Sequence, residues 1–467
     1  MLYTTESMIE RRAFYVKLMP ERVISVYNTE LYKRLHAEVC KIRIIDTHEH
    51  LSYPHDLEGM QKIDFGRMFL HYASSDLISA GMPRKDLEEI QNPNSKWTVT
   101  EKWQSMKPYY HRTWNTAYCE ALRIAMRDLF QIEDLMDNTV QVLSERINNV
   151  PRAEWTRMVF DKAGIDIALE QYLGSEPVYS RRRYPELFVC DMTDWFSHVD
   201  KGNIRNLGVC SGVDVYSLQD YLRVIDWYFE KFAVEASAFK IGRAYDRPIF
   251  FDDVSTSKAE EVFSSIMKFN SPPARNDVQA LEDYIVHYAI RKCAEYDLPV
   301  KFHTGLQEGN ENDIKNSRAA LLINLFMKYP KVKFDCYHIS WPYTEELINI
   351  CKNFANVYID FAWAWIMNPP ACRRFLSDML ETVPLTKIHG FGGDFIFVEG
   401  SYGHSVIARR EITRVLAEKV EEGRFSEEYA VYIANRLLRE NVNENFRIEE
   451  KRKIFAKRAM EDRTNYL

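Results

Sequence analysis

The sequence predicts a (β/α)₈ barrel, the TIM-barrel fold, with a long helical insertion after the first strand and extra helices at the termini. Three observations support this prediction. Short apolar runs of strand length recur along residues 42–395, and amphipathic segments of helical period lie between them. Their number is eight, which is the number of strand–helix units that closes such a barrel. We therefore treat residues 1–467 as a single domain.

Each element follows from its local pattern. Residues 1–40 carry apolar positions at helical spacing and are predicted to be helical. The first strand is IRIIDTHEH, residues 42–50. Residues from about 65 to 150 are helical in pattern and rich in aromatic side chains, so we expect an insertion in the first loop of the catalytic face. The remaining strands are predicted over residues 165–171, 186–192, 236–244, 298–305, 332–339, 357–364 and 388–395.

The composition is typical of a soluble globular enzyme. The chain has 467 residues, of which 46% are hydrophobic and 28% are charged, and its net charge of −7 gives no basic footprint for nucleic acid or an anionic membrane. The eight cysteines form no CxxC pair, so we expect free, mostly buried thiols and a cytoplasmic location. The opening residues are polar and charged, and no apolar run is long enough to span a membrane. A homo-oligomer is also expected, because soluble enzymes often form one.

Polar side chains at the carboxyl ends of the predicted strands suggest a metal site. His48 and His50 are two residues apart on a strand, so they face the same side. Later strands end near Lys240, His303, His338 and Asp394. Strand ends converge at one face of a barrel, and imidazoles with a carboxylate suit Zn²⁺, with Mn²⁺ or Fe²⁺ as alternatives. Taken alone, each residue has a structural reading, such as a core histidine or a helix cap.

Four motifs resemble the amidohydrolase superfamily of metal-dependent TIM-barrel hydrolases. DTHEH (residues 46–50) resembles its first-strand signature, KFHTG (301–305) and CYHIS (336–340) its fifth- and sixth-strand histidines, and FGGDF (391–395) its eighth-strand aspartate. NRLLRENVNENF (435–446) resembles the closing helix. Within the superfamily, the overall sequence pattern is most similar to the amidohydrolase-related branch, which includes decarboxylases. The helical insertion resembles that of uronate isomerases.

The resemblance implies a role for each residue. His48, His50, His303 and Asp394 would ligate one divalent metal ion, Zn²⁺ before Mn²⁺ or Fe²⁺. His338 would orient the activated water or act as acid and base, and Asp394 would accept the proton of that water. The implied function is hydrolysis of a C–N, ester or lactone bond in a small, carboxylate-bearing molecule. Decarboxylation or uronate-type isomerisation at the same site is the alternative, and a barrel that only binds is a third.

Two positions depart from the family patterns. Uronate isomerases usually carry an arginine two residues after the eighth-strand aspartate, where this chain has Ile396. Lys240 in the fourth strand has three readings: a carboxylated bridge between two metals, an ammonium for a substrate carboxylate, or a structural ion pair. A single metal is preferred.

Further candidates for substrate contacts follow the strands. Arg243 and Arg247 come after the fourth strand and could hold an anion, although loop arginines more often make structural contacts. Trp341, with Trp363 and Trp365, could line a pocket wall or simply pack, and His404 after the eighth strand could reach the substrate. His389 lies in mid-strand and is read as structural. All of these are predictions from position along the chain.

Overall fold

The computed structural model describes residues 29–51, 63–171, 185–269 and 273–465. Within them, eight parallel strands form a nearly closed barrel in the order β1 to β8, which confirms the predicted fold class. Two backbone hydrogen bonds join the first strand to the chain after the last: Asp394 donates to His48 and His50 donates to Phe395. The strands are β1 (Ile44–Glu49), β2 (Ile165–Gln171), β3 (Phe188–Thr193), β4 (Phe239–Ile241), β5 (Val300–Phe302), β6 (Phe334–Cys336), β7 (Val357–Ala362) and β8 (Ile388–Gly392).

All eight predicted strands are present, but several are shorter than the sequence suggested. β4, β5 and β6 are each three residues long. These three strands pair with one another only over those residues, and the chain then turns out of the sheet. His338 illustrates this: it lies in a short turn after β6 with a left-handed φ of 61°. Of the polar residues predicted at strand ends, His48 and Lys240 lie within β1 and β4, whereas the others sit just beyond their strands: His50, His303, His338 and Asp394.

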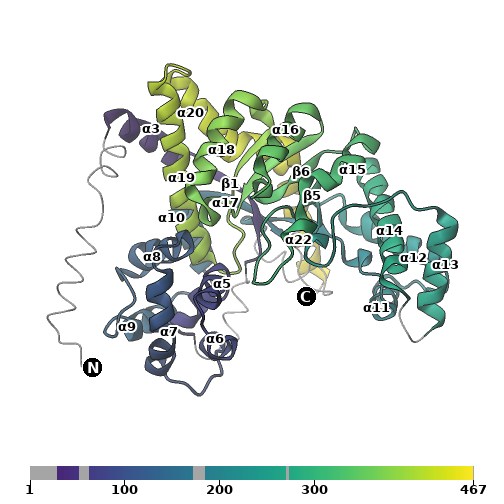
Figure 1. Ribbon diagram of the computed structural model, residues 1–467, viewed down its shortest axis with the longest axis horizontal. Coiled ribbons are helices and arrows are strands. Elements are labelled where there is room, and N and C mark those ends of the chain that lie inside the picture. Colours follow the sequence, from purple (N-terminus) through teal and green to yellow (C-terminus); the bar gives the residue numbers. More distant parts are fainter. Residues whose placement is uncertain (1–28, 52–62, 172–184, 270–272, 466–467) are drawn as a thin grey trace.

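The predicted insertion is a group of helices that packs against one side of the barrel (Figure 1). These helices lie between β1 and β2 in the sequence, and helix α8 (Ala117–Phe130) packs closely against the long helix α19 (Val398–Glu421) that follows β8. A Cβ on Gly403 of α19 would lie 2.0 Å from the Ala121 carbonyl oxygen of α8, so only glycine permits this contact. The elements from the insertion to β2 are η1 (Phe65–Phe69), α5 (Tyr72–Ser79), α6 (Arg84–Gln91), α7 (Val99–Thr113), α8 (Ala117–Phe130), α9 (Val140–Asn148) and α10 (Trp155–Ala163).

Local sequence explains where these helices begin and end. Thr98 and Glu101 form a reciprocal capping box at the start of α7, and the Thr116 side chain accepts the Cys119 N–H at the start of α8. α10 ends at Gly164, whose φ of 69° is readily adopted by glycine. Because these signals act within one turn of helix, helices could be predicted over residues 65–150 from the sequence alone.

Helices also follow the other strands and cover the barrel. At the amino-terminal side, α3 (Glu30–Lys41) lies where a helix was predicted over residues 1–40, of which residues 1–28 fall outside the described part. The elements after β3, β4 and β5 are η3 (Trp195–Ser197), α11 (Lys201–Ser211), α12 (Leu218–Phe232), η4 (Arg243–Tyr245), α13 (Thr256–Lys268), α14 (Arg275–Glu295), η5 (Ile314–Ser317), η6 (Ala319–Leu322) and α15 (Ile323–Lys328). Those after β6 are η7 (Tyr337–Ser340), α16 (Thr344–Asn353), α17 (Ala364–Met367), α18 (Pro369–Thr382), η8 (Leu385–Lys387), α19 (Val398–Glu421), α20 (Glu427–Asn435), η9 (Arg436–Glu440), α21 (Asn441–Phe446) and α22 (Ile448–Asn465).

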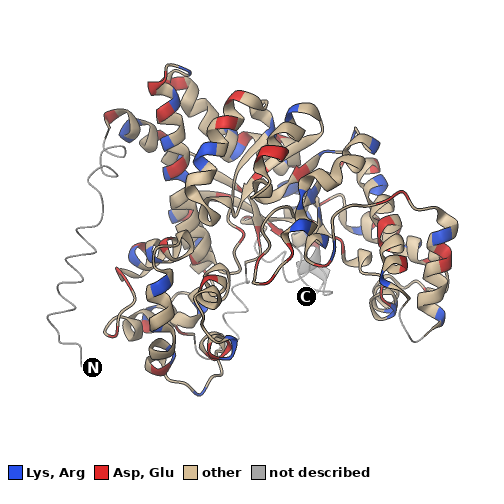
Figure 2. Cartoon of the chain, viewed as in Figure 1, with Lys and Arg blue, Asp and Glu red and all other residues tan. Residues whose placement is uncertain are grey.

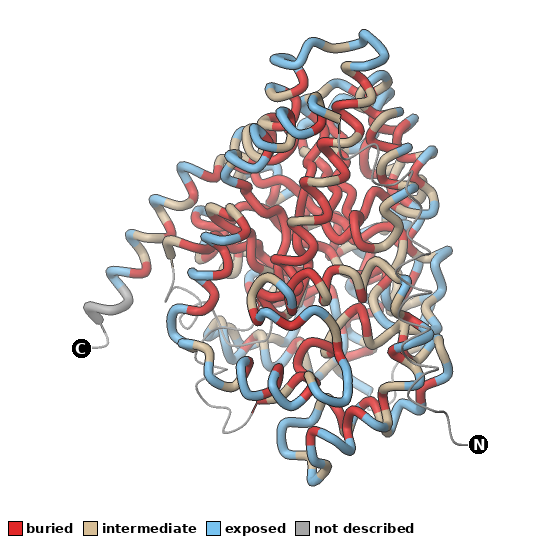
Figure 3. The backbone as a smooth tube through the Cα atoms, turned by 90° about the vertical axis from the view of Figure 1, so that its left-hand side faces the viewer, coloured by how far each residue is buried: buried red, intermediate tan, exposed pale blue. Residues whose placement is uncertain are grey.

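The core is continuous from the barrel into the insertion. Buried residues fill the centre of the molecule in Figure 3, and exposed residues lie on the outer helices. Charged residues of both signs are interspersed over those helices (Figure 2). All eight cysteines are free thiols, as predicted, and six of them are buried. Of the helices in the described ranges, none combines the length and low polarity needed to cross a membrane.

Candidate metal centre

Three predicted ligands converge at the point where β1 meets the chain after β8. His48 Nε2 lies 3.5 Å and His50 Nε2 3.3 Å from Asp394 Oδ1. One donor atom from each side chain lies within 4.8 Å of the other two. The strand alternation brings both imidazoles to one face, and the parallel barrel brings Asp394 beside them. The structure thus assembles two imidazole nitrogens and one carboxylate around a common point.

The protonation states suit a divalent cation. Burial holds the pKa of His48 well below its ordinary value, so its imidazole is neutral. Burial acts to raise the pKa of Asp394, but the neighbouring His48, His50 and His338 hold it well below its usual range. Neutral imidazoles and an ionised carboxylate are the forms that bind metals. The His50 side chain is 20% exposed, which leaves one side of the group open to water or substrate. These residues fit the implied metal.

His303 and His338 lie against each other at the edge of this group. His338 Nε2 is 3.0 Å from His303 Nδ1, and His338 Nδ1 lies 2.9 Å from the Ala362 carbonyl oxygen and 3.6 Å from Asp394 Oδ2. His303 Nε2 faces the Leu306 carbonyl oxygen at 3.0 Å. Burial lowers the pKa of both rings, to about 4 for His338, so each ring is neutral and carries one N–H. His338 donates its N–H to the Ala362 carbonyl, which leaves His303 with one N–H for two acceptors, His338 Nε2 and the Leu306 carbonyl oxygen. A cation between the two rings would relieve that conflict, and ligation by His303 stays a prediction.

Lys240 is a buried ammonium that lacks a hydrogen-bond partner among the described residues. Its Nζ lies 3.6 Å from the centre of the Tyr337 ring. Burial lowers its pKa to about 7. Lys301, on the neighbouring strand, is instead paired with Asp191 at 2.6 Å. The structural ion-pair reading of Lys240 therefore finds no support in the described residues, and the other two readings stay open.

The other predicted substrate residues have protein partners. Arg243 pairs with Glu282 at 2.7 Å, and Arg247 pairs with Glu282 at 3.0 Å and with Asp283 at 2.6 Å. All four are buried side chains, so the two guanidinium groups hold the loop after β4 against α14. A role for these arginines in substrate binding stays a prediction.

Some of the predicted tryptophans only pack in the core, whereas Trp363 and His404 lie next to residues of the site. Trp365 donates to the Gly390 carbonyl at 2.9 Å and is fully buried, as in simple packing. Trp363 lies edge-on to His338, with ring centres 5.3 Å apart. Trp341 is partly buried, and its carbonyl accepts the Leu306 N–H in the loop after β5. His404 is buried, and its Nδ1 lies 3.1 Å from the Gly393 carbonyl oxygen, beside Asp394.

The insertion contributes to the site a tyrosine that was not predicted from the sequence. Tyr72, in the first turn of α5, stacks on Trp363 with ring centres 4.2 Å apart and an angle of 13°. Burial raises the pKa of Tyr72, and the charge of the neighbouring Asp394 carboxylate raises it further. The adjoining His71 is also buried, and burial lowers its pKa to about 3. The aromatic content of the insertion was the available signal, but spacing alone could not select Tyr72.

A second cluster of possible ligands lies inside the barrel. Asp335, Asp360 and His389 are buried, and His389 Nδ1 is 3.0 Å from Asp335 Oδ1. Asn445 donates to the Thr386 carbonyl at 3.1 Å, which directs its remaining N–H at His389 Nε2, 3.0 Å away. His389 therefore carries its proton on Nδ1 and donates it to Asp335. This network fits the structural reading of His389 better than a metal site.

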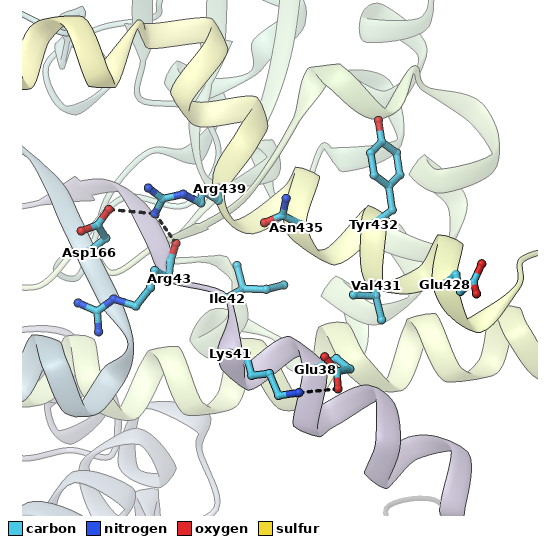
Figure 4. Close-up of a pocket in the computed structure, with 10 residues that line it drawn as sticks. All are labelled: Glu38, Lys41, Ile42, Arg43, Asp166, Glu428, Val431, Tyr432, Asn435 and Arg439. Carbon is cyan, nitrogen blue, oxygen red and sulfur yellow. Dashed lines mark hydrogen bonds and ion pairs between the residues drawn. The ribbon is translucent and has the colours of Figure 1, made fainter.

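A surface pocket of about 680 Å³ lies at the opposite end of the barrel (Figure 4). Its walls come from α3, α20, η9, the residues just before β1 and the start of β2, with Arg43, Asp166 and Arg439 among the lining residues. Arg439 is hydrogen-bonded to the Arg43 carbonyl and to Asp166, both at 2.9 Å. Arg43 precedes β1, whereas His48 and His50 lie at its other end. This pocket is therefore separate from the metal centre.

Comparisons with known proteins agree with the fold and the motifs. Residues 263–425 match the amidohydrolase family model Amidohydro_2. The protein fluG of Emericella nidulans is 27% identical over 206 residues, which is 43% of this chain but 24% of that protein's length. The crystal structures of uronate isomerase from Thermotoga maritima and glucuronate isomerase from Caulobacter crescentus both have TM-scores of 0.73, at 15% and 18% identity. Each comparison covers 90% of this chain, with 98% and 94% of the other chain. The predicted resemblance is thus confirmed: this chain has an amidohydrolase family match over residues 263–425, on the barrel fold of the uronate isomerases.

Proposed function

We propose that this metal-dependent enzyme hydrolyses a C–N, ester or lactone bond in a small, carboxylate-bearing molecule. The convergence of His48, His50 and Asp394, with Asp394 ionised and the His50 side open, carries this proposal. Zn²⁺ is the proposed cofactor, because two imidazoles and a carboxylate are ligands that it commonly takes, with Mn²⁺ or Fe²⁺ as alternatives. A metal bound there would polarise a carbonyl and lower the pKa of a water molecule.

The two oxygens of Asp394 have different surroundings, which suits a proton acceptor that is also a ligand. Oδ1 faces His48 and His50, whereas Oδ2 lies 3.6 Å from His338 Nδ1. A proton taken from an attacking water by Asp394 would be held on Oδ2, away from His48 and His50, and would then pass to the leaving group of the substrate. General acid–base transfer of this kind contributes about 10²- to 10⁴-fold in rate.

Lys240 is the proposed partner of the substrate carboxylate. Its ammonium is buried without a hydrogen bond from the described residues, so an incoming carboxylate would satisfy it and raise its pKa. A charge-assisted hydrogen bond in a buried site is stronger than one in water. This arrangement would favour carboxylate-bearing substrates over neutral analogues of the same size.

A second candidate is isomerisation or decarboxylation without hydrolysis, and Tyr72 favours it. A phenol beside the Asp394 carboxylate places a proton donor near a base, as proton shuttling between two carbons of a sugar acid requires. The similarity in fold to a uronate isomerase supports this candidate as well. Ile396 opposes it, because uronate isomerases usually have an arginine at that position.

The test is a substrate screen of the zinc-loaded protein in ¹⁸O-enriched water. The panel should pair lactones, N-acyl amino acids and uronates with neutral analogues that lack the carboxylate. Product that contains solvent ¹⁸O and disappears in Asp394→Asn would support hydrolysis. Aldose–ketose conversion or CO₂ release without ¹⁸O incorporation would replace it with the second candidate. Binding without any turnover would favour a barrel that has lost catalysis.

A further inference from the structure

The residues of DTHEH that do not point into the metal centre hold the loop that carries Asp394. Asp46 and Glu49 are fully buried carboxyl side chains on β1. Asp46 Oδ1 accepts the Gly393 N–H at 3.0 Å, and Glu49 Oε2 accepts the Phe395 N–H at 2.8 Å. Between them, the Asp394 N–H donates to the His48 carbonyl at 2.8 Å. Three consecutive amides of the ligand loop are therefore fixed by β1.

This pattern matters because the backbone at Asp394 is unusual. Its φ is 58°, in the left-handed region that residues other than glycine seldom adopt. Without its hydrogen-bond partners, the loop would relax toward ordinary backbone angles and carry the carboxylate away from His48 and His50. Surrounding contacts must hold such a conformation in place.

The fit between the loop and the two carboxyl groups is close. A Cβ on Gly393 would lie 1.9 Å from Glu49 Oε1 and 3.1 Å from Asp46 Oδ2, so a side chain there would displace them. Asp46 Oδ1 also accepts the His48 N–H at 3.1 Å and so contacts the backbone of a ligand on β1 as well. Asp46 and Glu49 thus link the two strands that supply the ligands.

We infer that Asp46 and Glu49 are positioning residues that hold Asp394 in place for the metal. They form a carboxyl clasp, defined here as the two side chains and the amides of Gly393 and Phe395 that they accept. The inference rests on the metal centre of the proposed function but not on which reaction occurs there. Second-layer contacts of this kind typically change metal affinity by about 10- to 100-fold.

The test uses three variants of the full chain. Glu49→Ala removes the acceptor of the Phe395 N–H, whereas Glu49→Gln keeps a carbonyl oxygen in the same place. Glu399→Ala is the matched control, because Glu399 is also a buried carboxylate and accepts the Trp155 indole N–H at 2.8 Å instead. Zn²⁺ affinity is measured by chelator competition, and amide exchange of residues 391–397 is followed by mass spectrometry in metal-free protein.

We expect Glu49→Ala to weaken Zn²⁺ binding by about 10- to 100-fold and to speed exchange of residues 391–397. Glu49→Gln should have nearly the Zn²⁺ affinity and the exchange rate of the wild type. Glu399→Ala should change neither the affinity nor the exchange rate. The inference is overturned if Glu49→Ala binds Zn²⁺ normally, or if Glu49→Gln loses as much affinity as Glu49→Ala. A wild-type protein that binds no Zn²⁺ would refute the proposed function, and unchanged exchange in Glu49→Ala would refute the clasp independently.

Discussion

Lys240 and Lys301 offer a sharp comparison, because two buried ammonium groups face the same tyrosine ring and only one is paired. Lys240 Nζ lies 3.6 Å and Lys301 Nζ 5.5 Å from the centre of Tyr337. Lys301 pairs with Asp191 at 2.6 Å, whereas Lys240 has no hydrogen-bond partner in the described part of the chain. We predict that Lys240→Met stabilises the metal-free protein and that Lys301→Met destabilises it.

The magnitude follows from the pKa of Lys240. Burial lowers it from 10.5 to about 7, and a factor of ten in proton affinity corresponds to about 1.4 kcal/mol. At pH 7 the buried ammonium therefore costs the fold about 4 kcal/mol relative to an exposed lysine. Loss of the cation–π contact with Tyr337 returns about 1–2 kcal/mol of this, so the net gain in the free energy of unfolding is about 2–3 kcal/mol. Lys301→Met leaves the buried Asp191 carboxylate without its cation, although Ser237 Oγ still donates to it at 2.6 Å. Loss of one partner of a buried ion pair typically costs about 3–5 kcal/mol.

The pH dependence gives a second check. The folded-state pKa of Lys240 lies below its unfolded-state value, so the unfolded chain binds the extra proton between these two values. The loss of folding stability caused by the buried Lys240 ammonium is therefore largest below about pH 7, and it disappears as the pH rises through about 10.5. Urea midpoints of chelator-treated proteins at pH 7 and pH 9 would measure both effects. Equal destabilisation by Lys240→Met and Lys301→Met would refute the reasoning, since it would mean that Lys240 has a partner.

Three further predictions concern the site. His48→Ala should lose the bound metal while Lys240→Ala keeps about one equivalent, as measured by mass spectrometry of metal content; loss of one of two equivalents in Lys240→Ala would indicate a carboxylated lysine. Tyr72→Phe should lower kcat by about 10²-fold or more with little change in Zn²⁺ affinity, because it removes a proton donor and not a ligand; an unchanged kcat would exclude that role. Burial lowers the pKa of His404 to about 4, so unfolding takes up a proton there below about pH 6.5, and stability is lost as the pH falls toward 4. His404→Gln should flatten this acid dependence of the urea midpoint, and an equally steep dependence in the variant would contradict the assignment.

Much of the barrel could be predicted from the sequence because its signals are local. Each strand is an apolar run set by burial, and each helix has its own period and caps, so both are visible within about ten residues. The convergence of His48, His50 and Asp394 could be predicted as well, since parallel strands of a barrel end at one face. With eight strands predicted, the last strand closes the barrel beside the first, which places Asp394 next to His48 and His50.

The partners of charged side chains could not be predicted in this way. For Arg243 and Arg247 the sequence left both an anion site and structural contacts open, and it could not tell that Glu282 and Asp283 of α14 lie against them. The sequence contains many carboxylates and gives no means of choosing between them. Spacing along the chain reports which face a side chain occupies, not which distant group it meets.

The sequence by itself determined the barrel, its helical insertion and the ligand types at the strand ends, because these follow from periodicity and strand order. Only the tertiary structure decided that α5 brings Tyr72 onto Asp394, that Lys240 is left without a hydrogen-bond partner among the described residues, and that Glu49 holds the Phe395 amide. The physical reason is that these contacts join segments that are far apart in the chain. Their distances depend on how the insertion and the strand-end loops pack, which no local pattern records.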